Sequence, residues 1–194
     1  ATRADCLPEP VLDLLSEING RTHLVVELGQ QTVLDETARR IGRGHDYAAF
    51  LRGYESLNSR GIRVCVLIIN GLPGENREMM LETARELARL HAFSVKIHLL
   101  HIMRGTRLAD WYAAGEFSEM SLEDYASTVV SQLELLPPDT VIGRVTGDGA
   151  ADGLVAPLWS RKKFVVMNEI DKELVRRGSM QGSRYAVNGL PHSV

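Results

Sequence analysis

The stretch IRVCVLIINGLPGE, residues 62–75, decides the fold of this chain. Its first eight residues are rich in β-branched side chains and almost continuously apolar, which is typical of a strand in a parallel sheet with helices on both faces. The NGLPG segment that follows consists of turn-forming residues and predicts a loop. Residues 75–91, rich in Glu, Met, Leu, Ala and Arg, predict a long helix. A strand, a loop and a helix in this order form half of a βαβ crossover.

Similar units lie on both sides of this stretch. The runs HLVVEL (23–28) and VKIHLL (95–100) predict two further strands, and 140–145 predicts a weaker one. Other helices are expected at 7–19, 32–41, 47–59, 107–114, 121–136 and 160–177. The alternation of helices and strands predicts an α/β fold with a mostly parallel sheet, either a sector of a barrel or an open doubly wound sheet.

Composition excludes several classes of protein. The chain has 194 residues, of which 44% are hydrophobic, and 22 Lys and Arg against 25 Asp and Glu. Near-balanced charge argues against a broad nucleic-acid-binding face, and the longest apolar run, Val64 to Ile69, is far too short to span a bilayer. The two cysteines, Cys6 and Cys65, form no CxxC pair, which argues against a disulfide framework or a zinc knuckle. We therefore expect a cytoplasmic protein with no membrane partner.

In both parallel architectures, ligands bind beyond the carboxyl ends of the strands. The first such end contains Glu27 and Gln31. A carboxylate in a buried strand needs a partner, so Glu27 either faces a ligand hydroxyl or forms an ion pair with a Lys or Arg of the sheet. Gln31 can both donate and accept hydrogen bonds, which suits a ribose or an amide.

The second and third strand ends predict different chemistry. Gly71 and Gly74 allow the backbone to approach a flat ligand closely, and Glu75 stands at a helix start that favours an anion. Neither a Walker A loop nor a GxGxxG loop is present, so phosphate binding is disfavoured. His98 and His101 lack a carboxylate or cysteine partner nearby in sequence, so we predict no metal site and no catalytic residue.

The segments VELGQQT, IINGLPGE and VKIHLLHIMRGT, in this order, resemble strands four, five and six of a radical S-adenosylmethionine (SAM) barrel. The resemblance is closest to bacterial radical SAM proteins described as Fe–S oxidoreductases, which are related to the elongator catalytic subunit and the methylthiotransferases, and it covers residues 1–185. It implies a partial (β/α) barrel over 1–139, a C-terminal strand and helix extension over 140–178, and a flexible tail over 179–194.

The resemblance also implies cofactors and site residues. Members of this family bind a [4Fe–4S] cluster through a CxxxCxxC loop and cleave SAM reductively to start radical chemistry. The SAM contacts of the family would fall on Glu27, Gln31, Ile69, Asn70, Gly71, Gly74, Leu100, His101, Ile102 and Met103.

One departure from the family pattern changes this expectation. The sequence contains no CxxxCxxC, and two separated cysteines cannot supply three cluster ligands. We therefore expect the C-terminal part of a radical SAM protein, starting after strand three. SAM and the cluster would belong to the parent, while this chain alone binds neither and is inactive. The alternative is a stand-alone small-ligand-binding or protein-interaction module without catalysis.

Two partner expectations follow. The strand at 23–28 would form an open barrel edge, which predicts a homodimer. Nucleic acid enters only by analogy with relatives that act on tRNA.

Overall fold

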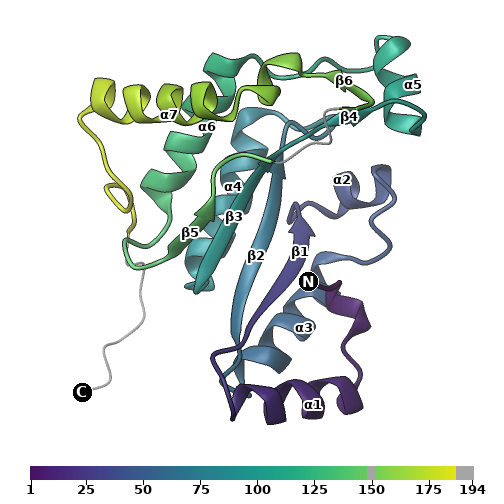
Figure 1. Cartoon of the computed structure of the whole chain (residues 1–194), viewed down its shortest axis with the longest axis vertical. Helices are drawn as coiled ribbons and strands as arrows, with labels where there is room; N and C mark the ends of the chain where they lie inside the picture. Colours follow the sequence, from purple (N-terminus) through teal and green to yellow (C-terminus); the bar gives the residue numbers. More distant parts are fainter. Residues whose placement is uncertain (148–151, 187–194) are drawn as a thin grey trace.

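A four-stranded parallel sheet forms the centre of the molecule (Figure 1). The computed structural model describes residues 1–147 and 152–186. The strands lie in the order β1 (Val25–Gln31), β2 (Arg63–Asn70), β3 (Ser94–Leu99) and β5 (Val141–Arg144). Every neighbouring pair is parallel, so all four carboxyl ends meet at one edge. The predicted α/β class and parallel sheet are confirmed.

The helices lie close to the predicted ranges. They are α1 (Glu9–Asn19), α2 (Asp35–Arg40), α3 (Tyr47–Asn58), α4 (Arg77–Arg89), α5 (Arg107–Ala113), α6 (Leu122–Leu135) and α7 (Lys163–Arg177), with short 3-10 turns η1 (Ala4–Cys6) and η2 (Leu158–Arg161). Side-chain caps fix several starts: Asp46 accepts from the Ala49 amide and Asn76 from the Met79 amide. None of these helices in the described part of the chain is long and apolar enough to cross a membrane.

Helix α2 is shorter than predicted because residues 32–34, which were expected in its first turn, form a loop held by Thr32. Thr32 Oγ1 accepts a hydrogen bond from the Leu34 amide at 3.1 Å and donates to Glu75 Oε1 at 2.6 Å. These contacts hold residues 32–34 in a loop next to the loop that follows β2, and the helix begins only at Asp35.

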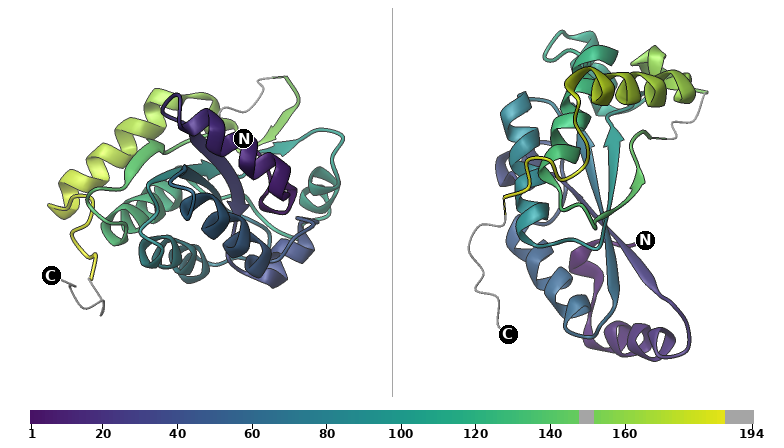
Figure 2. Two further views of the ribbon diagram at one scale, coloured as in Figure 1. Left: turned by 90° about the horizontal axis from the view of Figure 1, so that it is seen from below. Right: turned by 90° about the vertical axis from the view of Figure 1, so that its left-hand side faces the viewer.

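Helices α3, α4 and α6 cover one face of the sheet, and the hydrophobic core lies between them and the strands (Figure 2). Leu28, Val66 and Ile97 point into this layer and are fully buried. The opposite face carries half-buried side chains, among them Glu27 and Lys96. The apolar run of β2 predicts helices on both faces. Within the described residues that part of the prediction is wrong, since only one face has a helix layer (Figure 2).

A second, two-stranded sheet was not predicted. Strand β4 (Ile102–Met103) pairs antiparallel with β6 (Leu154–Ala156) beyond the carboxyl edge of the main sheet, near α5. Strands of two or three residues carry no readable periodicity, which is why the sequence shows no sign of them.

The C-terminal segment packs on α6. Helix α7 lies against α6, where the Arg177 guanidinium donates to the hydroxyls of Ser127 and Ser131 at 2.8 and 2.9 Å. Residues 179–186, for which the sequence predicts a flexible tail, continue along α6: the Gly182 amide donates to the Leu133 carbonyl at 3.0 Å. The rest of the predicted tail, residues 187–194, and part of the predicted 147–153 loop, residues 148–151, lie outside the described residues.

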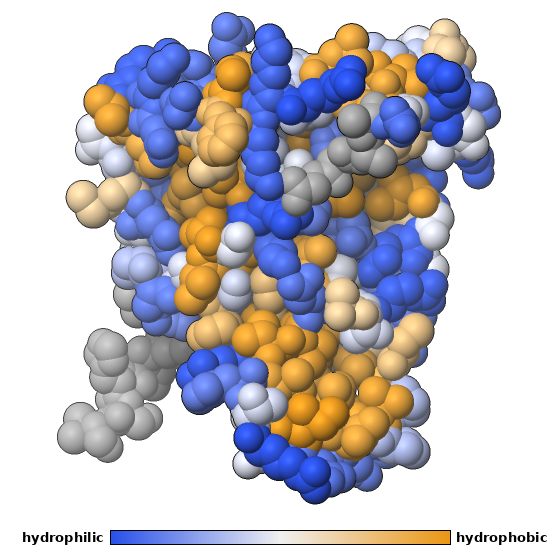
Figure 3. All heavy atoms as spheres, in the orientation of Figure 1, coloured by the Kyte–Doolittle hydropathy of each residue, from blue (hydrophilic) through white to orange (hydrophobic). Residues whose placement is uncertain are grey.

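The outer edge of β1 is covered at its carboxyl half. Thr2 forms a parallel bridge with Leu28, its amide donating to the Glu27 carbonyl at 2.8 Å. At the amino end of the strand Val25 is 43% exposed, and Leu14 of α1 is 56% exposed. Hydrophobic atoms gather over this lower region of the molecule (Figure 3).

Candidate functional site

The carboxyl ends of the strands form the candidate site, and hydrogen bonds tie neighbouring ends together. Glu75, after β2, accepts from Thr32, after β1. The Leu100 amide, after β3, donates to the Asn70 carbonyl at the end of β2 at 2.9 Å. Parallel pairing thus brings together residues that lie up to about 70 positions apart in the chain.

The end of β1 departs from regular strand geometry, and a buried polar atom there has no hydrogen-bond partner among the described residues. The register shifts between Gly29 and Gln31, and Gln31 adopts a left-handed backbone with φ 65°. Such a conformation costs a residue with a side chain on the order of 1–2 kcal/mol. Gln31 Oε1 is buried and has no hydrogen-bond partner among the described residues. Strain and an unsatisfied polar atom at a strand end are typical of a ligand site.

Arg43 joins Gln31 in this place, and sequence reasoning missed it. Its guanidinium donates to the Gly29 carbonyl, while its Nε is buried and unpartnered in the described part of the structure. A Cβ built on Gly29 would lie 2.8 Å from Gln31 Nε2 and 3.0 Å from Arg43 Nη2, so a side chain there would displace the ends of these two side chains. Burial lowers the pKa of the Arg43 guanidinium. The sequence signal, an arginine between Gly42 and Gly44, indicates only a helix end.

Glu27 forms an ion pair instead of standing free for a ligand. The Lys96 ammonium reaches across β2 to the Glu27 carboxylate on the half-buried face of the sheet. This hydrogen bond lowers the pKa of Glu27, in opposition to partial burial. Of the two alternatives that the sequence left open, the described structure has the ion pair.

At the end of β2, the side chain of Asn70 is not available to a ligand, because its amide is buried and already hydrogen-bonded. Asn70 and Gln132 of α6 exchange two amide hydrogen bonds of 2.8 Å, and both residues are almost completely buried. The Gln132 amide also donates to the Met80 carbonyl at 3.1 Å. The alternation of side chains along β2 points Asn70 into the helix layer. The prediction of Asn70 as a SAM contact did not take this orientation into account. Its backbone remains at the edge of the sheet.

The glycines after β2 have the conformations that the sequence predicts. Gly71 and Gly74 adopt φ of 86° and 89°, which side-chain-bearing residues avoid. Ile69 is half-buried, on the same face as Glu27. Burial raises the pKa of Glu75, while hydrogen bonds from Thr32 and Thr37 act in the opposite direction.

At the end of β3, the predicted residues separate into two groups. Ile102 is fully buried in β4, whereas Leu100 and Met103 are half-buried. His101 Nε2 lies 3.1 Å from Ser160 Oγ, whose hydroxyl donates to the Pro157 carbonyl at 2.7 Å. The Ser160 hydrogen is therefore directed at a carbonyl, and Ser160 is no activated nucleophile.

The end of β5 joins the site beside His101. A Cβ built on Gly147 would lie 2.9 Å from His101 Cε1. The β3–β5 pairing brings this segment to the same edge as the other strand ends. Among residues 1–147 and 152–186, no group of three or more His, Cys, Asp or Glu side chains is arranged to hold a metal ion.

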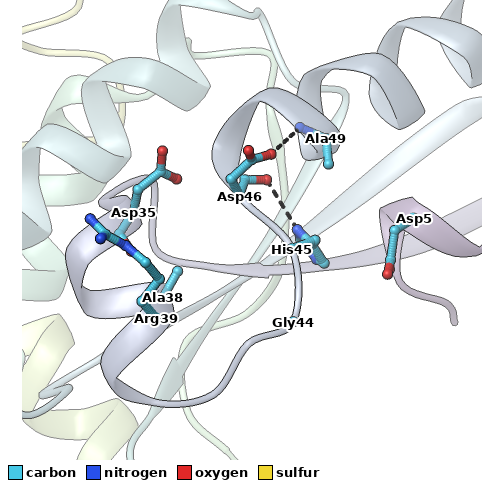
Figure 4. A pocket seen from close by; sticks show the side chains of 8 residues that line it. All are labelled: Asp5, Asp35, Ala38, Arg39, Gly44, His45, Asp46 and Ala49. Carbon is cyan, nitrogen blue, oxygen red and sulfur yellow. Dashed lines mark hydrogen bonds between the residues drawn. The ribbon is translucent and has the colours of Figure 1, made fainter.

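A cavity of about 610 Å³ lies apart from these predicted residues (Figure 4). It is lined by Asp5, Asp35, Ala38, Arg39, Gly44, His45, Asp46 and Ala49. Its carboxylates already serve the fold: Asp35 accepts from the Tyr47 amide at 2.7 Å and Asp46 caps α3. We therefore place the candidate site at the strand ends.

An arginine–tryptophan cluster borders the strand ends. Arg40 of α2 and Arg107 of α5 lie with their guanidinium carbons 5.7 and 4.6 Å from the centre of the Trp111 ring. Arg40 also packs on Gly74, where a built Cβ would lie 2.8 Å from its Nη1. Sequence reasoning missed this cluster because its members belong to helices 67 positions apart.

Family profiles match both halves of the chain. The Radical SAM superfamily profile matches residues 2–87, and that of the Radical SAM C-terminal domain matches residues 93–176.

Several curated proteins are similar over nearly the whole chain. YtqA of Bacillus subtilis is 48% identical, covering 94% of this chain and 56% of that protein. YhcC of Escherichia coli is 37% identical, covering 98% of this chain and 62% of that protein. Elongator complex protein 3 of Homo sapiens is 30% identical over 76% of this chain and 27% of that protein. The chain thus spans little more than half the length of YtqA and YhcC.

The fold is found in a solved structure of an Elp3 protein. Elp3 of Methanocaldococcus infernus, with an N-terminal deletion, superposes with a TM-score of 0.80 at 21% identity, covering 93% of this chain and 42% of that one. The predicted partial barrel is consistent with this match.

Proposed function

The chain belongs to the radical SAM superfamily, and from this premise we propose that its strand ends form the adenosine side of a SAM-binding site. The parent protein would be a radical SAM enzyme acting on a substrate that remains to be identified. In such enzymes SAM, bound at a [4Fe–4S] cluster, supplies a 5′-deoxyadenosyl radical on reductive cleavage.

Two of the buried atoms without hydrogen-bond partners at the end of β1 carry the proposal. Buried Gln31 Oε1 is an acceptor and buried Arg43 Nε is a donor. Leaving such groups without partners costs about 1–3 kcal/mol each, so a ligand that pairs with them is favoured. A guanidinium suits the carboxylate of the methionine part of SAM, and a glutamine suits the ribose hydroxyls.

The adenine ring would lie against the backbone that follows β2 and β3. Gly71 and Gly74 present backbone without a side chain, and the half-buried Ile69, Leu100 and Met103 supply apolar contact. The side chains of Met120 and Arg40 lie next to the two glycines and would have to move aside for a flat ring. Asn70, His101 and Ile102 would contribute through their backbone, because their side chains are engaged elsewhere.

The cluster does not fit the residues of this chain. Its only cysteines are Cys6, which is exposed, and Cys65, which is buried beside Ser94. Burial raises the pKa of the Cys65 thiol, which disfavours the thiolate that iron requires. The sequence alone predicts no SAM binding by this chain. The unpaired atoms at the end of β1 lead us to expect instead that the isolated chain binds an adenosyl ligand weakly, on the order of millimolar, and does not cleave SAM.

A titration with S-adenosylhomocysteine, an analogue without the reactive sulfonium, tests the site. In ¹⁵N NMR spectra we expect the amide signals of Gln31, Gly71 and Leu100 to move together, while signals of α7 stay fixed. A stand-alone module for another ligand predicts no such change. Anaerobic iron–sulfide reconstitution of the same chain should yield no cluster and no SAM cleavage, and either product would contradict the expected inactivity.

A nucleic-acid substrate is a second candidate, favoured by the Arg40–Trp111–Arg107 cluster. Guanidinium groups bind phosphates, and aromatic rings stack on bases. We expect Arg40→Gln with Arg107→Gln to weaken RNA binding and to reduce its salt dependence. Binding that is unchanged would reject this candidate without affecting the SAM site.

The part of the β1 edge that is open to a second copy is shorter than the sequence predicts, because Thr2 already pairs with the carboxyl half of this edge. We propose that any dimer uses the lower part, near Val25 and Leu14. A monomer in light scattering at high micromolar concentration would reject it.

A further inference from the structure

Met120, in the segment before α6, covers the part of the site proposed for the adenine ring. A Cβ built on Gly71 would lie 3.3 Å from both Cγ and Sδ of Met120, and 3.8 Å from Leu100 Cβ. Gly71 follows β2 and Leu100 follows β3. One thioether from outside the sheet therefore shares the space at two neighbouring strand ends.

The backbone of Met120 is anchored, while its side chain is half-buried. Trp159 Nε1 donates to the Met120 carbonyl at 3.1 Å. The Trp159 ring in turn packs on fully buried Tyr125, with ring centres 5.6 Å apart. This hydrogen bond fixes where the Met120 side chain starts, and the side chain packs at the edge of the core.

A second methionine makes the contrast clear. The Gly71 amide donates to Sδ of Met80 at 3.3 Å, and Met80 is only 4% exposed. The space next to Gly71 is thus bordered by two methionines, of which Met80 is buried and Met120 is half-buried at the edge of the core. Of the two, Met120 is the one placed to meet a ligand.

Methionine is well suited to such a position. Its unbranched, polarizable side chain adapts its shape and makes favourable contacts with aromatic rings. A flat ring approaching the peptide groups of Gly71 and Leu100 meets the Met120 thioether, because Gly71 itself has no side chain to present.

We propose that Met120 is a ligand-contact residue that packs its thioether against the purine ring of the adenosyl ligand. The inference rests on the proposed function and deepens it, since it adds a contact that lies on none of the strand ends.

Methyl NMR of the chain labelled with [¹³C-methyl]methionine tests this inference. The chain has six methionines, and Met120→Leu, which keeps the volume, assigns the signal. With millimolar 5′-deoxyadenosine as the probe, we expect the ring current of the purine to move the Met120 methyl signal. Met167 and Met180, which are 41% and 70% exposed, are matched controls and should stay fixed.

Affinity supplies a second readout. Met120→Ala should weaken 5′-deoxyadenosine binding by about two- to tenfold, as expected for the loss of a sulfur–aromatic contact. Met167→Ala should leave it unchanged. If Met120→Ala fails to fold, the methyl signal of the unmodified chain still decides.

The outcomes separate the two proposals. If the probe moves the amide signals of Gly71 and Leu100 but not the Met120 methyl, the role of Met120 is overturned and the SAM site stands. If the probe moves none of these signals, both proposals are overturned.

Discussion

The ends of β1 and β2 lie side by side at the same edge of the sheet, yet they satisfy their polar groups in opposite ways. At β2 the amide of Asn70 is paired on both atoms with Gln132, and nothing is left for a ligand except backbone. At β1, Gln31 and Arg43 keep buried atoms without partners in the described structure. The difference teaches that hydrogen-bond satisfaction, and not the presence of a polar residue at a strand end, separates a binding position from a structural one.

Asn70→Ala should have the largest effect on stability. It leaves the buried amide of Gln132 without its partner, for which we expect a loss of about 2–3 kcal/mol in the free energy of unfolding, measured by urea titration. Asn70→Leu combined with Gln132→Leu serves as the control, because removing both partners restores much of the loss. An Asn70→Ala chain as stable as the unmodified one would break the contrast between the two strand ends.

Arg43→Met should mainly affect binding. Loss of a charge-assisted hydrogen bond to a carboxylate predicts a drop of about tenfold or more in affinity for S-adenosylhomocysteine, measured by NMR titration. Arg39→Met, on the exposed side of nearby α2, is the matched control and should bind normally. Equal loss in the two variants would show that general charge, and not the position of Arg43, is responsible.

Gln31→Gly should separate stability from binding. Glycine relieves the left-handed strain at φ 65° but adds entropy to the unfolded chain, so the free energy of unfolding should stay equal or rise by up to about 1 kcal/mol. Binding of S-adenosylhomocysteine should weaken at the same time. A clear loss of stability would mean that the Gln31 side chain supports the fold, as Asn70 does.

Glu75→Gln should have the smallest effect, visible as a change in pH dependence. Because burial raises the pKa of Glu75 in the folded state, its stabilising contribution is complete at pH below the ordinary carboxyl range and is lost as pH rises through the folded value. The unmodified chain should therefore lose stability relative to Glu75→Gln as pH rises above the ordinary carboxyl range, as followed by thermal unfolding. Parallel pH profiles would contradict this.

Much of the fold could be predicted from sequence because it depends on local signals. The apolar run of β2 and the glycines at 71 and 74 define a strand, a tight loop and a helix without knowledge of the rest of the chain. Gln31 could be predicted as a site residue for the same reason, since it lies at the carboxyl end of a strand.

What could not be predicted depends on contacts between distant positions. Arg43 reaches the Gly29 carbonyl only through the path of α2, and the partner of Asn70 lies 62 residues away. Whether Glu27 meets a ligand or a lysine was likewise open until the register placed Lys96 two strands away. Strands β4 and β6 exist only as a pair and have no pattern of their own.

The measurement that tests the central claim most directly compares two ligands on the unmodified chain. S-adenosylhomocysteine carries the amino-acid part whose carboxylate Arg43 would hold, and 5′-deoxyadenosine lacks it. We predict that the first binds at least about tenfold more tightly, as one charge-assisted hydrogen bond implies. Equal affinities would contradict the claim that the end of β1 is the polar half of a SAM site.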